Sequence, residues 1–278
     1  MMLNKFYVDE LIKTALREDI NYVDVSADYL ISEDKRSDSY FIAKDSGVLC
    51  GIDVAMRVFE MLDETFTCTV YKKDGDKVNK GDIIAEFSGK TVCLLKGERT
   101  ALNLIQHMSG IATMTSRAVE LCKGTDASVT DTRKTLPGLR AIQKYAVVCG
   151  GGKNHRYNLS DGAMLKDNHI DSYNGIENAV AALRAKLGHM VKIEVETRNI
   201  EEVSQAVNAG ADIIMLDNMS CEQMAQCVKF IDGRAKTEAS GNITLENIAE
   251  VTKTGVDIIS LGALTHSVKA FDISMRMK

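Results

Sequence analysis

Between residues 127 and 265, short apolar runs repeatedly end in polar residues or glycine, and segments with apolar residues at helical spacing follow them. The strands predicted from these runs are 128–132, 161–166, 191–196, 212–216, 235–239 and 256–261, with helices in the gaps. Apolar strands that alternate with amphipathic helices are typical of parallel sheets with helical crossovers. The pattern therefore predicts an α/β fold that closes, or nearly closes, into a barrel.

The first 110 residues have a different pattern. It predicts an amphipathic helix over Met1–Ile20, a helix over 53–62, and strands at 40–43, 47–51, 67–71 and 83–87. We expect a small α+β sandwich domain over 1–110 and a barrel domain over 111–265. The C-terminal tail, from about 266 to 278, can pack with the first domain.

The turn-rich segment 74–82 carries a G-D-x-V-x-x-G-D pattern that is similar to the hairpin of lipoyl-carrier domains. Such domains need an exposed lysine at a second hairpin, and none is evident. A structural turn between two strands is the preferred interpretation.

A strong apolar stripe begins after Gly97 and predicts a helix that starts there, with a second helix that ends at Gly124. Arg99 would then lie in a first helical turn, where the helix dipole disfavours a cation. Either Glu98 offsets this charge, or Arg99 is placed there to meet an anion.

Charge and composition exclude several classes of protein. The chain has 278 residues, 45% of them hydrophobic, and a net charge of −5, which argues against nucleic acid or an anionic membrane as the main partner. No apolar run predicts a signal peptide or a membrane span. The seven cysteines contain no CxxC pair and are interpreted as reduced core residues. These features together predict a cytoplasmic protein.

Polar residues at the predicted strand ends are the candidate chemistry. Thr132, Arg133 and Lys134 follow one strand, at a strand-to-helix junction of the kind where α/β folds bind ligands. Glu196, Asp217, Ser240 and Gly262 follow one another at intervals of about one strand–helix unit. Because parallel strands carry their carboxyl ends on one edge, we expect these residues to share a site.

Sorted by charge, the candidates form complementary sets. The cations are Arg99, Arg133, Lys134, His155, Arg156 and Lys166, and the carboxylates are Glu196 and Asp217. The loops Ser240-Gly241-Asn242 and Leu261-Gly262-Ala263 offer backbone N–H groups that suit phosphate at helix N-termini. A substrate with several carboxylates or phosphates, and one Mg²⁺ on the two acidic residues, matches these sets.

Strand 191–196 also carries charges where a doubly covered strand is normally apolar. Lys192, Glu194 and, in another strand, Glu238 are costly to bury unless they are paired or ligated. Internal ion pairs would account for them, and Lys192 and Glu194 can be purely structural partners.

Several segments occur in the order found in one enzyme family. They are GERTALN at 97–103, DTRKTLPGLR at 131–140, His155-Arg156 after three glycines, KDNH at 166–169, MLDN at 215–218 and EASGNI at 238–243. Across nearly the whole chain, the sequence resembles the quinolinate phosphoribosyltransferases, also called nicotinate-nucleotide diphosphorylases (carboxylating). One departure is Leu136, where a threonine is expected. The departure removes no candidate charge.

The resemblance implies an N-terminal α/β sandwich, an incomplete α/β barrel and a homodimer. It implies that quinolinate and phosphoribosyl pyrophosphate give nicotinate mononucleotide, pyrophosphate and CO₂ with Mg²⁺. Arg133, His155, Arg156 and Lys166 would hold the quinolinate carboxylates, with Arg99 supplied by the neighbouring subunit. Lys134 would face the pyrophosphate end, Glu196 and Asp217 would hold Mg²⁺ and the ribose hydroxyls, and loops 240–242 and 261–263 would take the 5′-phosphate.

Three other interpretations remain open at this stage. A molybdenum-transport accessory paralogue shares much of the pattern. A Schiff-base aldolase would use Lys134 or Lys166 as a buried amine. A non-catalytic barrel could sense a phosphorylated metabolite, although anion sensing does not call for two carboxylates at adjacent strand ends.

Overall fold

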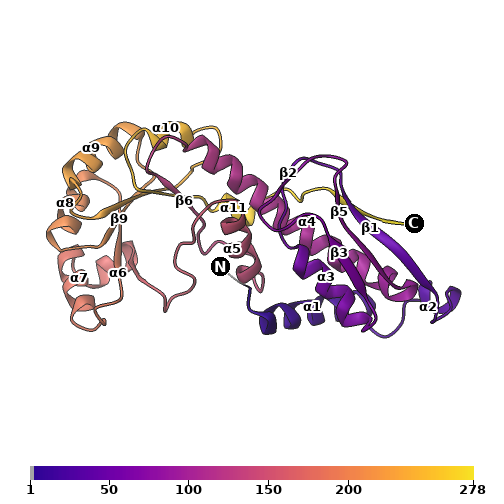
Figure 1. Cartoon of the computed structure of the whole chain (residues 1–278). Helices are drawn as coiled ribbons and strands as arrows, with labels where there is room; N and C mark the ends of the chain where they lie inside the picture. The colour runs from indigo at the N-terminus through magenta and orange to yellow at the C-terminus, as the bar shows by residue number, and fades with distance from the viewer. Residues whose placement is uncertain (1–2) are drawn as a thin grey trace. The chain divides into compact units, whose positions relative to one another are not determined.

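The computed structural model describes residues 3–278, which form two compact units. The first unit comprises the chain up to Ser116 together with 136–151 and 267–278, and the second comprises 117–135 and 152–266. Figure 1 traces the chain from end to end. Met1 and Met2, which the first predicted helix included, lie outside the described residues.

The first unit is built on antiparallel strands. Its strands are β1 (Arg36–Ala43), β2 (Gly47–Val48), β3 (Thr67–Val70), β4 (Lys77–Val78), β5 (Ile83–Lys90) and β12 (Ile273–Met277). Its helices are α1 (Lys5–Ile20), α2 (Ala27–Leu30), α3 (Ile52–Leu62), most of α4 (Thr91–Leu121) and α5 (Arg140–Cys149). The main sheet has the order β12-β1-β5-β3, so the C-terminal tail supplies an edge strand beside β1.

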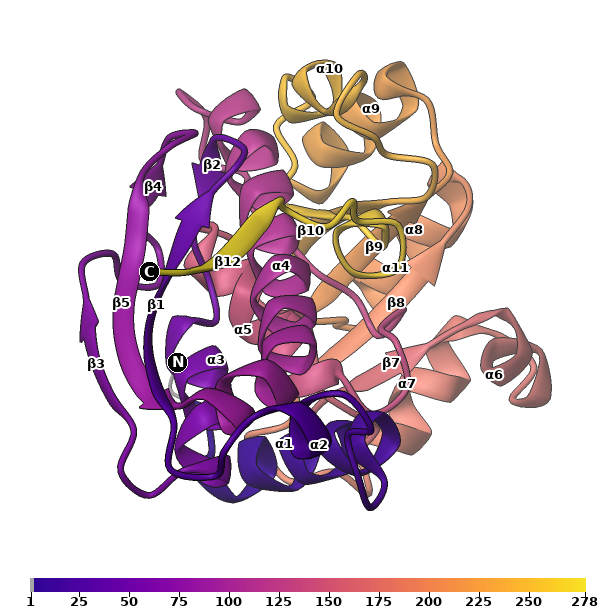
Figure 2. The same cartoon turned by 90° about the vertical axis from the view of Figure 1, so that its right-hand side faces the viewer.

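The core of the first unit lies between this sheet and its helices. Figure 2 shows α3 and α4 on the same face of the sheet. The ring of Phe87 in β5 packs 5.0 Å from that of Phe41 in β1 and 5.1 Å from that of Phe59 in α3, centroid to centroid. The alternation of buried and accessible side chains along β1 directs Phe41 and Ala43 into this core.

Helix α4 corrects one sequence-based prediction. It runs without interruption from Thr91 to Leu121. The prediction was one helix that starts at Gly97 and a second helix that ends at Gly124. Gly97 and Gly110 lie inside α4 because their neighbours are close: a Cβ on Gly97 would meet Phe59 at 2.8 Å, and one on Gly110 would clash with the Lys269 carbonyl oxygen. Arg99 is therefore beyond the first turn, and the expected dipole penalty on its charge was wrong.

Segment 136–151 also differs from the expected domain limits, because it groups with the first unit. The contacts of α5 explain this: the Tyr145 hydroxyl donates to Asp74 Oδ2 at 2.9 Å, and Gln143 Nε2 lies 2.9 Å from His107 Nε2. A helix that follows a barrel strand in sequence thus finds its polar partners in the first unit.

Asp74 is a structural residue of this unit. The N-cap of α3 is Gly51, which has no side chain to cap the helix, and Asp74 Oδ1 accepts the N–H groups of Gly51 and Ile52 at 2.8 and 3.0 Å. Its other oxygen accepts from Tyr145. Burial raises the pKa of Asp74, and these hydrogen bonds oppose the shift.

We expect Asp74→Ala to lower the free energy of unfolding by about 1–3 kcal/mol, because it leaves two helix-end N–H groups and a hydroxyl without their acceptor. The measurement is urea unfolding followed by circular dichroism. Asp76→Ala is the matched control, since Asp76 is exposed and its Oδ2 accepts the Lys73 N–H. Equal stabilities for the two variants would contradict the capping role.

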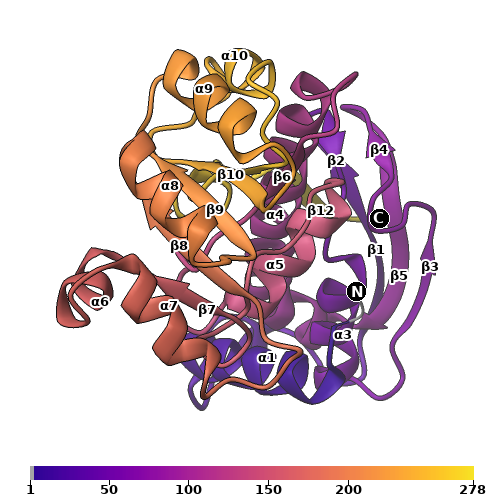
Figure 3. The same ribbon diagram turned by 90° about the vertical axis from the view of Figure 1, so that its left-hand side faces the viewer.

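The second unit contains a parallel sheet of six strands. They are β6 (Ser128–Thr130), β7 (Ala163–Leu165), β8 (Ile193–Thr197), β9 (Ile213–Asp217), β10 (Lys236–Ser240) and β11 (Ile258–Ser260), in the order β6-β11-β10-β9-β8-β7. The helices are α6 (Asp167–Ser172), α7 (Ile176–Arg184), α8 (Ile200–Asn208), α9 (Cys221–Ile231), α10 (Ile248–Thr252) and α11 (Ala263–His266). Figure 3 shows α7, α8 and α9 along the outside of the strands.

This topology confirms the predicted α/β class with an incomplete barrel. The sheet ladder is open between β6 and β7, which are its two edges, so the closed form of the prediction does not apply. All six predicted strands are present, most of them shorter than expected.

Two further expectations can be compared with the structure. None of the helices within residues 3–278 combines the length and apolar character needed to cross a bilayer. All seven cysteines are free, but Cys68 and Cys221 are exposed, so the interpretation of all seven as core residues was wrong.

Candidate active site

The parallel sheet brings most of the predicted site residues to one edge. Glu196 lies at the end of β8, Asp217 ends β9 and Ser240 ends β10, and Asp217 and Ser240 are register partners. The segment from Asp131 to Lys134 follows β6, and Leu261–Gly262 follows β11. The expectation that these residues occupy the carboxyl ends of adjacent strands is confirmed.

A buried carboxylate joins two of the segments that carry cations. Asp131 is 0% exposed, and its Oδ1 accepts the backbone N–H of His155 at 3.0 Å while its Oδ2 accepts from Asn154 Nδ2 at 2.6 Å. Asp131 directly precedes Thr132, Arg133 and Lys134. It therefore fixes the segment of His155 and Arg156 against the end of β6.

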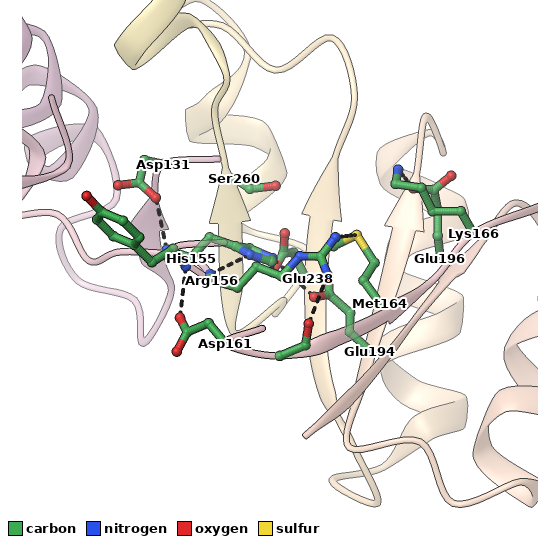
Figure 4. A network of polar contacts seen from close by, with 12 residues as sticks. Asp131, His155, Arg156, Asp161, Met164, Lys166, Glu194, Glu196, Glu238 and Ser260 are labelled. Atoms are coloured by element: carbon green, nitrogen blue, oxygen red, sulfur yellow. Dashed lines mark hydrogen bonds and ion pairs between the residues drawn. The ribbon is translucent and has the colours of Figure 1, made fainter. Parts of the chain in front are cut away.

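The side chain of His155 points into the barrel toward two glutamates (Figure 4). Its Nε2 lies 3.1 Å from Glu194 Oε2 and 3.4 Å from Glu238 Oε2. The other ring nitrogen, Nδ1, accepts the backbone N–H of Arg156 at 2.8 Å. We call His155, Glu194 and Glu238 the interior cluster.

The interior cluster retains its protons at neutral pH. Burial alone would lower the pKa of His155, but the hydrogen bonds and charges of the two glutamates raise it to about 10. Burial likewise raises the pKa of Glu194. The three side chains titrate together, so these pKa shifts belong to the cluster as a whole. The Nε2–H of the ring is the group that faces the two carboxylates.

A metal ion does not suit the interior cluster, although its three side chains are potential ligands. A histidine ligand presents a lone pair to the metal, whereas Nε2 here carries the hydrogen that faces the carboxylates.

A cavity of about 250 Å³ adjoins the interior cluster. Its lining includes Thr130, Arg156, Glu194 and Glu238. Thr130 Oγ1 and the Oε1 atoms of both glutamates are buried and have no hydrogen-bond partner among residues 3–278. The cavity has room for several water molecules at ~30 Å³ each, which would satisfy these atoms.

Arg156 is held by the segment that leads into β7. Its Nη1 donates to the Gly162 carbonyl oxygen at 2.8 Å, and its Nη2 lies 3.6 Å from Met164 Sδ. Burial and the neighbouring charge of Arg133 lower the pKa of Arg156, and the charge of Glu194 opposes this shift. Two arginines that repel each other in this way favour an anion between or beside them.

Lys166 and Glu196 form an ion pair at the ends of neighbouring strands, which Figure 4 shows apart from the interior cluster. Lys166 is also the N-cap residue of α6. Lys192, in contrast, pairs with Asp212 at 3.1 Å, so Lys192 and Glu194 are not partners of each other.

Asp217 leads into a chain of amide hydrogen bonds. Asn218 Nδ2 donates to Asp217 Oδ2 at 2.7 Å, and Asn242 Nδ2 donates to Asn218 Oδ1 at 3.0 Å. A Cβ on Gly241, whose φ is +91°, would clash with the same Asn218 oxygen. The loop at 240–242 is thereby packed against the end of β9.

The loop at 261–263 lies beside Lys134. A Cβ on Gly262 would approach Lys134 Cδ to 2.9 Å, and Thr265 Oγ1 donates to the Lys134 carbonyl oxygen at 2.7 Å. Helix α11 starts at Ala263, whereas α10 starts at Ile248, well after Asn242. The expected helix N-terminus therefore follows the second loop but not the first.

Three further predicted site residues are Arg99, Thr132 and Lys134. Arg99 lies on α4, in the first unit, with an exposed side chain. Thr132 Oγ1 accepts the Lys134 N–H at 3.0 Å, so the hydroxyl stabilises its own loop. Lys134 is exposed.

Sequence reasoning did not select Asp131, Asn218, Glu194 or Glu238 as site residues. The charges inside predicted strands were the signal for the two glutamates. Asp131 and Asn218 lay in the motifs DTRK and MLDN but carried no separate signal, because their importance rests on contacts with distant segments.

The carboxylates of Glu196 and Asp217 provide hard oxygen donors at the ends of adjacent, hydrogen-bonded strands. Such a donor set fits Mg²⁺, which binds one or two protein carboxylates and completes its shell with water and phosphate oxygens.

An incomplete parallel barrel with an arginine, two lysines and two carboxylates at its carboxyl edge defines a class: α/β-barrel proteins that bind anionic substrates. Comparison with protein-family models matches residues 24–109 to the N-terminal domain of quinolinate phosphoribosyl transferase and residues 111–276 to its C-terminal domain. The chain belongs to the quinolinate phosphoribosyl transferase family.

Individual relatives agree with this family. The chain is 45% identical over 273 residues to a probable nicotinate-nucleotide pyrophosphorylase (carboxylating) of Bacillus subtilis (strain 168), covering 98% of this chain and 94% of the relative. The crystal structure of NadC from Streptococcus pyogenes matches with a TM-score of 0.97 and 43% identity, over 100% of this chain and 99% of that one. The nicotinate-nucleotide pyrophosphorylase from Francisella tularensis gives a TM-score of 0.96 and 41% identity, over 100% and 98%.

We expect Gly241→Ala to destabilise the protein more than Gly233→Ala. Both glycines have positive φ, +91° and +71°, so alanine strains the backbone at either position. At Gly241 the new Cβ would also clash with Asn218, whereas at Gly233 nothing lies within 4 Å. Thermal unfolding of the two variants isolates the steric part. Equal melting temperatures would show that loop 240–242 does not depend on its contact with Asn218.

Proposed function

We propose that this chain transfers the phosphoribosyl group of phosphoribosyl pyrophosphate to quinolinate, with loss of CO₂, to give nicotinate mononucleotide and pyrophosphate in NAD biosynthesis. The observation that carries the proposal is the combination of two neighbouring arginines, Arg133 and Arg156, with the Lys166–Glu196 pair and Asp217 at the carboxyl ends of the strands. Family membership and the names of the relatives support the same reaction. A cytoplasmic location is part of this proposal.

In this proposal, Arg133, His155, Arg156 and Lys166 bind the two carboxylates of quinolinate, and Thr132 lies beside Arg133 in the same segment. Guanidinium groups match carboxylates in geometry and remain charged at every physiological pH. Nicotinate, with one carboxylate fewer, would leave part of this cationic set without its anion and should be a very poor substrate.

The phosphoribosyl pyrophosphate would lie along the remaining strand ends. Glu196 and Asp217 would hold Mg²⁺ and the ribose hydroxyls, which requires Glu196 to exchange its contact with Lys166. Lys134 would face the pyrophosphate. Loops Ser240-Gly241-Asn242 and Leu261-Gly262-Ala263 would bind the 5′-phosphate through backbone N–H groups.

In the proposed reaction, positive charge develops on the ribose and negative charge on the pyrophosphate, and each lies near protein groups of the opposite charge. Ribose C1 becomes positively charged as pyrophosphate leaves, and the carboxylates of Glu196 and Asp217 stabilise that charge. Lys134 stabilises the departing pyrophosphate, and bound Mg²⁺ would add positive charge there. The pyridine nitrogen attacks C1 and becomes cationic. Its positive charge stabilises the electron pair that stays on the adjacent ring carbon as the carboxylate departs as CO₂, and that carbon then uses the pair to take up a proton.

The structure gives less support to a Schiff-base aldolase. A nucleophilic lysine needs a lowered pKa, usually from burial or a neighbouring cation. Lys166 is instead 47% exposed and paired with the Glu196 carboxylate, and Lys134 is also exposed, so neither is the buried amine that this chemistry uses. The relatives described above carry pyrophosphorylase names, so the molybdenum-transport alternative has no comparable support.

The proposal is tested by the loss of quinolinate absorbance, which should require both phosphoribosyl pyrophosphate and Mg²⁺. Arg133→Ala removes a charge-assisted bond worth roughly 1.5–3 kcal/mol and should lower kcat/KM for quinolinate at least about 10-fold. Arg198→Ala is the control, since that arginine is exposed and pairs with Glu202, four residues further along the chain. Wild-type protein that consumes no quinolinate would refute the function.

We further propose a homodimer in which Arg99 acts in the site of the neighbouring subunit, as the sequence resemblance implies. Mixing inactive Arg99→Ala protein with inactive Lys134→Ala protein, under conditions of subunit exchange, should then restore about 25% of wild-type activity. Half of the randomly paired dimers are mixed, and one of their two sites is intact.

The control mixes Arg133→Ala with Lys134→Ala. Both residues belong to the same segment of one chain, so each site in a mixed dimer lacks one of them and no activity should return. Recovery in neither mixture would place Arg99 in its own subunit's site or outside the site altogether.

A further inference from the structure

Both ring nitrogens of His155 are engaged inside the protein. Nδ1 accepts the N–H of Arg156 at 2.8 Å, and Nε2 faces Glu194 and Glu238 at 3.1 and 3.4 Å. The side chain is only 12% exposed. A ring that uses both nitrogens in this way has no donor left for a substrate carboxylate.

The two glutamates are buried where a barrel strand normally carries apolar residues. Glu194 is 4% exposed and Glu238 is 1% exposed, and one oxygen of each has no partner among the described residues. Burying such groups costs free energy. Two apolar side chains of similar size would fill the core equally well. The free-energy cost of burying Glu194 and Glu238 therefore indicates that they have a role in the neighbouring site.

The contacts show what the glutamates hold in place. The His155 backbone N–H is fixed by Asp131, and its ring is fixed by the glutamates from the opposite direction. The ring in turn fixes the N–H of Arg156, whose guanidinium reaches the Gly162 carbonyl oxygen. The orientation of Arg156 therefore depends on the His155 ring, whose Nε2 is held by Glu194 and Glu238.

We propose that Glu194 and Glu238 are positioning residues for quinolinate binding: they hold the His155 ring inside the barrel, and the ring sets the direction of Arg156. His155 then contacts the protein and not the substrate, and the arginines and Lys166 carry the carboxylate recognition. This inference rests on the proposed function and reassigns one residue within it.

For holding the His155 ring, the length of the side chain at position 238 should then matter more than its charge. Glutamine keeps an oxygen at the distance of Glu238 Oε2, where it can still accept from Nε2–H. Aspartate keeps the charge but is one methylene shorter, and alanine keeps neither. A purely electrostatic role predicts the opposite order for glutamine and aspartate.

The experiment measures KM for quinolinate and for phosphoribosyl pyrophosphate in Glu238→Gln, Glu238→Asp and Glu238→Ala. We expect the aspartate and alanine variants to raise KM for quinolinate at least about 10-fold, the effect of losing one contact of ~1.4 kcal/mol. The glutamine variant should stay within about 3-fold of wild type, and KM for phosphoribosyl pyrophosphate should change less than about 2-fold in all three.

Matched substitutions at Glu250, whose exposed side chain pairs with Lys253, are the controls. Thermal unfolding establishes that each variant is folded. If the alanine variant does not fold, the comparison of aspartate with glutamine still decides between reach and charge.

A second measurement is independent of turnover. Nitrogen-15 NMR of the imidazoles, with the His155 signals assigned from a His155→Gln spectrum, should show that Nε2 stays protonated throughout the range from pH 6 to 8, with and without quinolinate.

An Nε2 that is not protonated would overturn the inference, and so would wild-type KM values in the aspartate variant or a raised quinolinate KM in the glutamine variant. Failure of the proposed function itself is distinguishable, because wild-type protein would then turn over no quinolinate while the NMR result still tests the His155 contacts.

Discussion

The site depends on a single buried carboxylate, that of Asp131. Its two oxygens hold the segment of Asn154 and His155 against the end of β6, and Arg133 follows it by two residues. Arginines from two segments separated in sequence are thereby brought close enough for one to lower the pKa of the other. Such repulsion costs stability in the empty protein and is relieved when an anion binds. Under the proposed function, these groups are in position before the substrate arrives, which reduces the entropy lost on binding.

The polar groups of the parallel sheet lie at two depths, one at the strand ends and one inside the barrel. At the carboxyl ends of the strands lie the exposed or half-buried groups that the proposed function assigns to substrate and metal, among them Lys166, Glu196 and Asp217. Deeper inside, Glu194 is two residues earlier on the same strand and faces the interior with Glu238. Because alternate residues of a strand share a face, Glu194 and Glu196 point to the same side at different depths. One strand thus supplies both a group for the site and a group that supports it.

Much of the fold was accessible from local patterns. The antiparallel strands of the first unit, the parallel strands of the second and the order of site residues along the strand ends all followed from periodicity and turn residues. The two-helix prediction around Gly97 failed because glycine usually marks a helix end, whereas here Gly97 admits Phe59 and Gly110 admits the backbone at Lys269. Segment 136–151 groups with the first unit for a related reason: its polar partners, Asp74 and His107, are far away in sequence.

The sequence by itself determined the fold class, the family resemblance and the identity of the charged residues at the strand ends, because these follow from local spacing and from the parallel direction of the strands. Only the tertiary structure decided which charges pair. It directed His155 toward Glu194 and Glu238, Lys166 toward Glu196 and Lys192 toward Asp212. Spacing along a chain fixes the strand end that carries a side chain, but the partner of a charge depends on strand register, side-chain reach and burial, which exist only once distant segments have packed together.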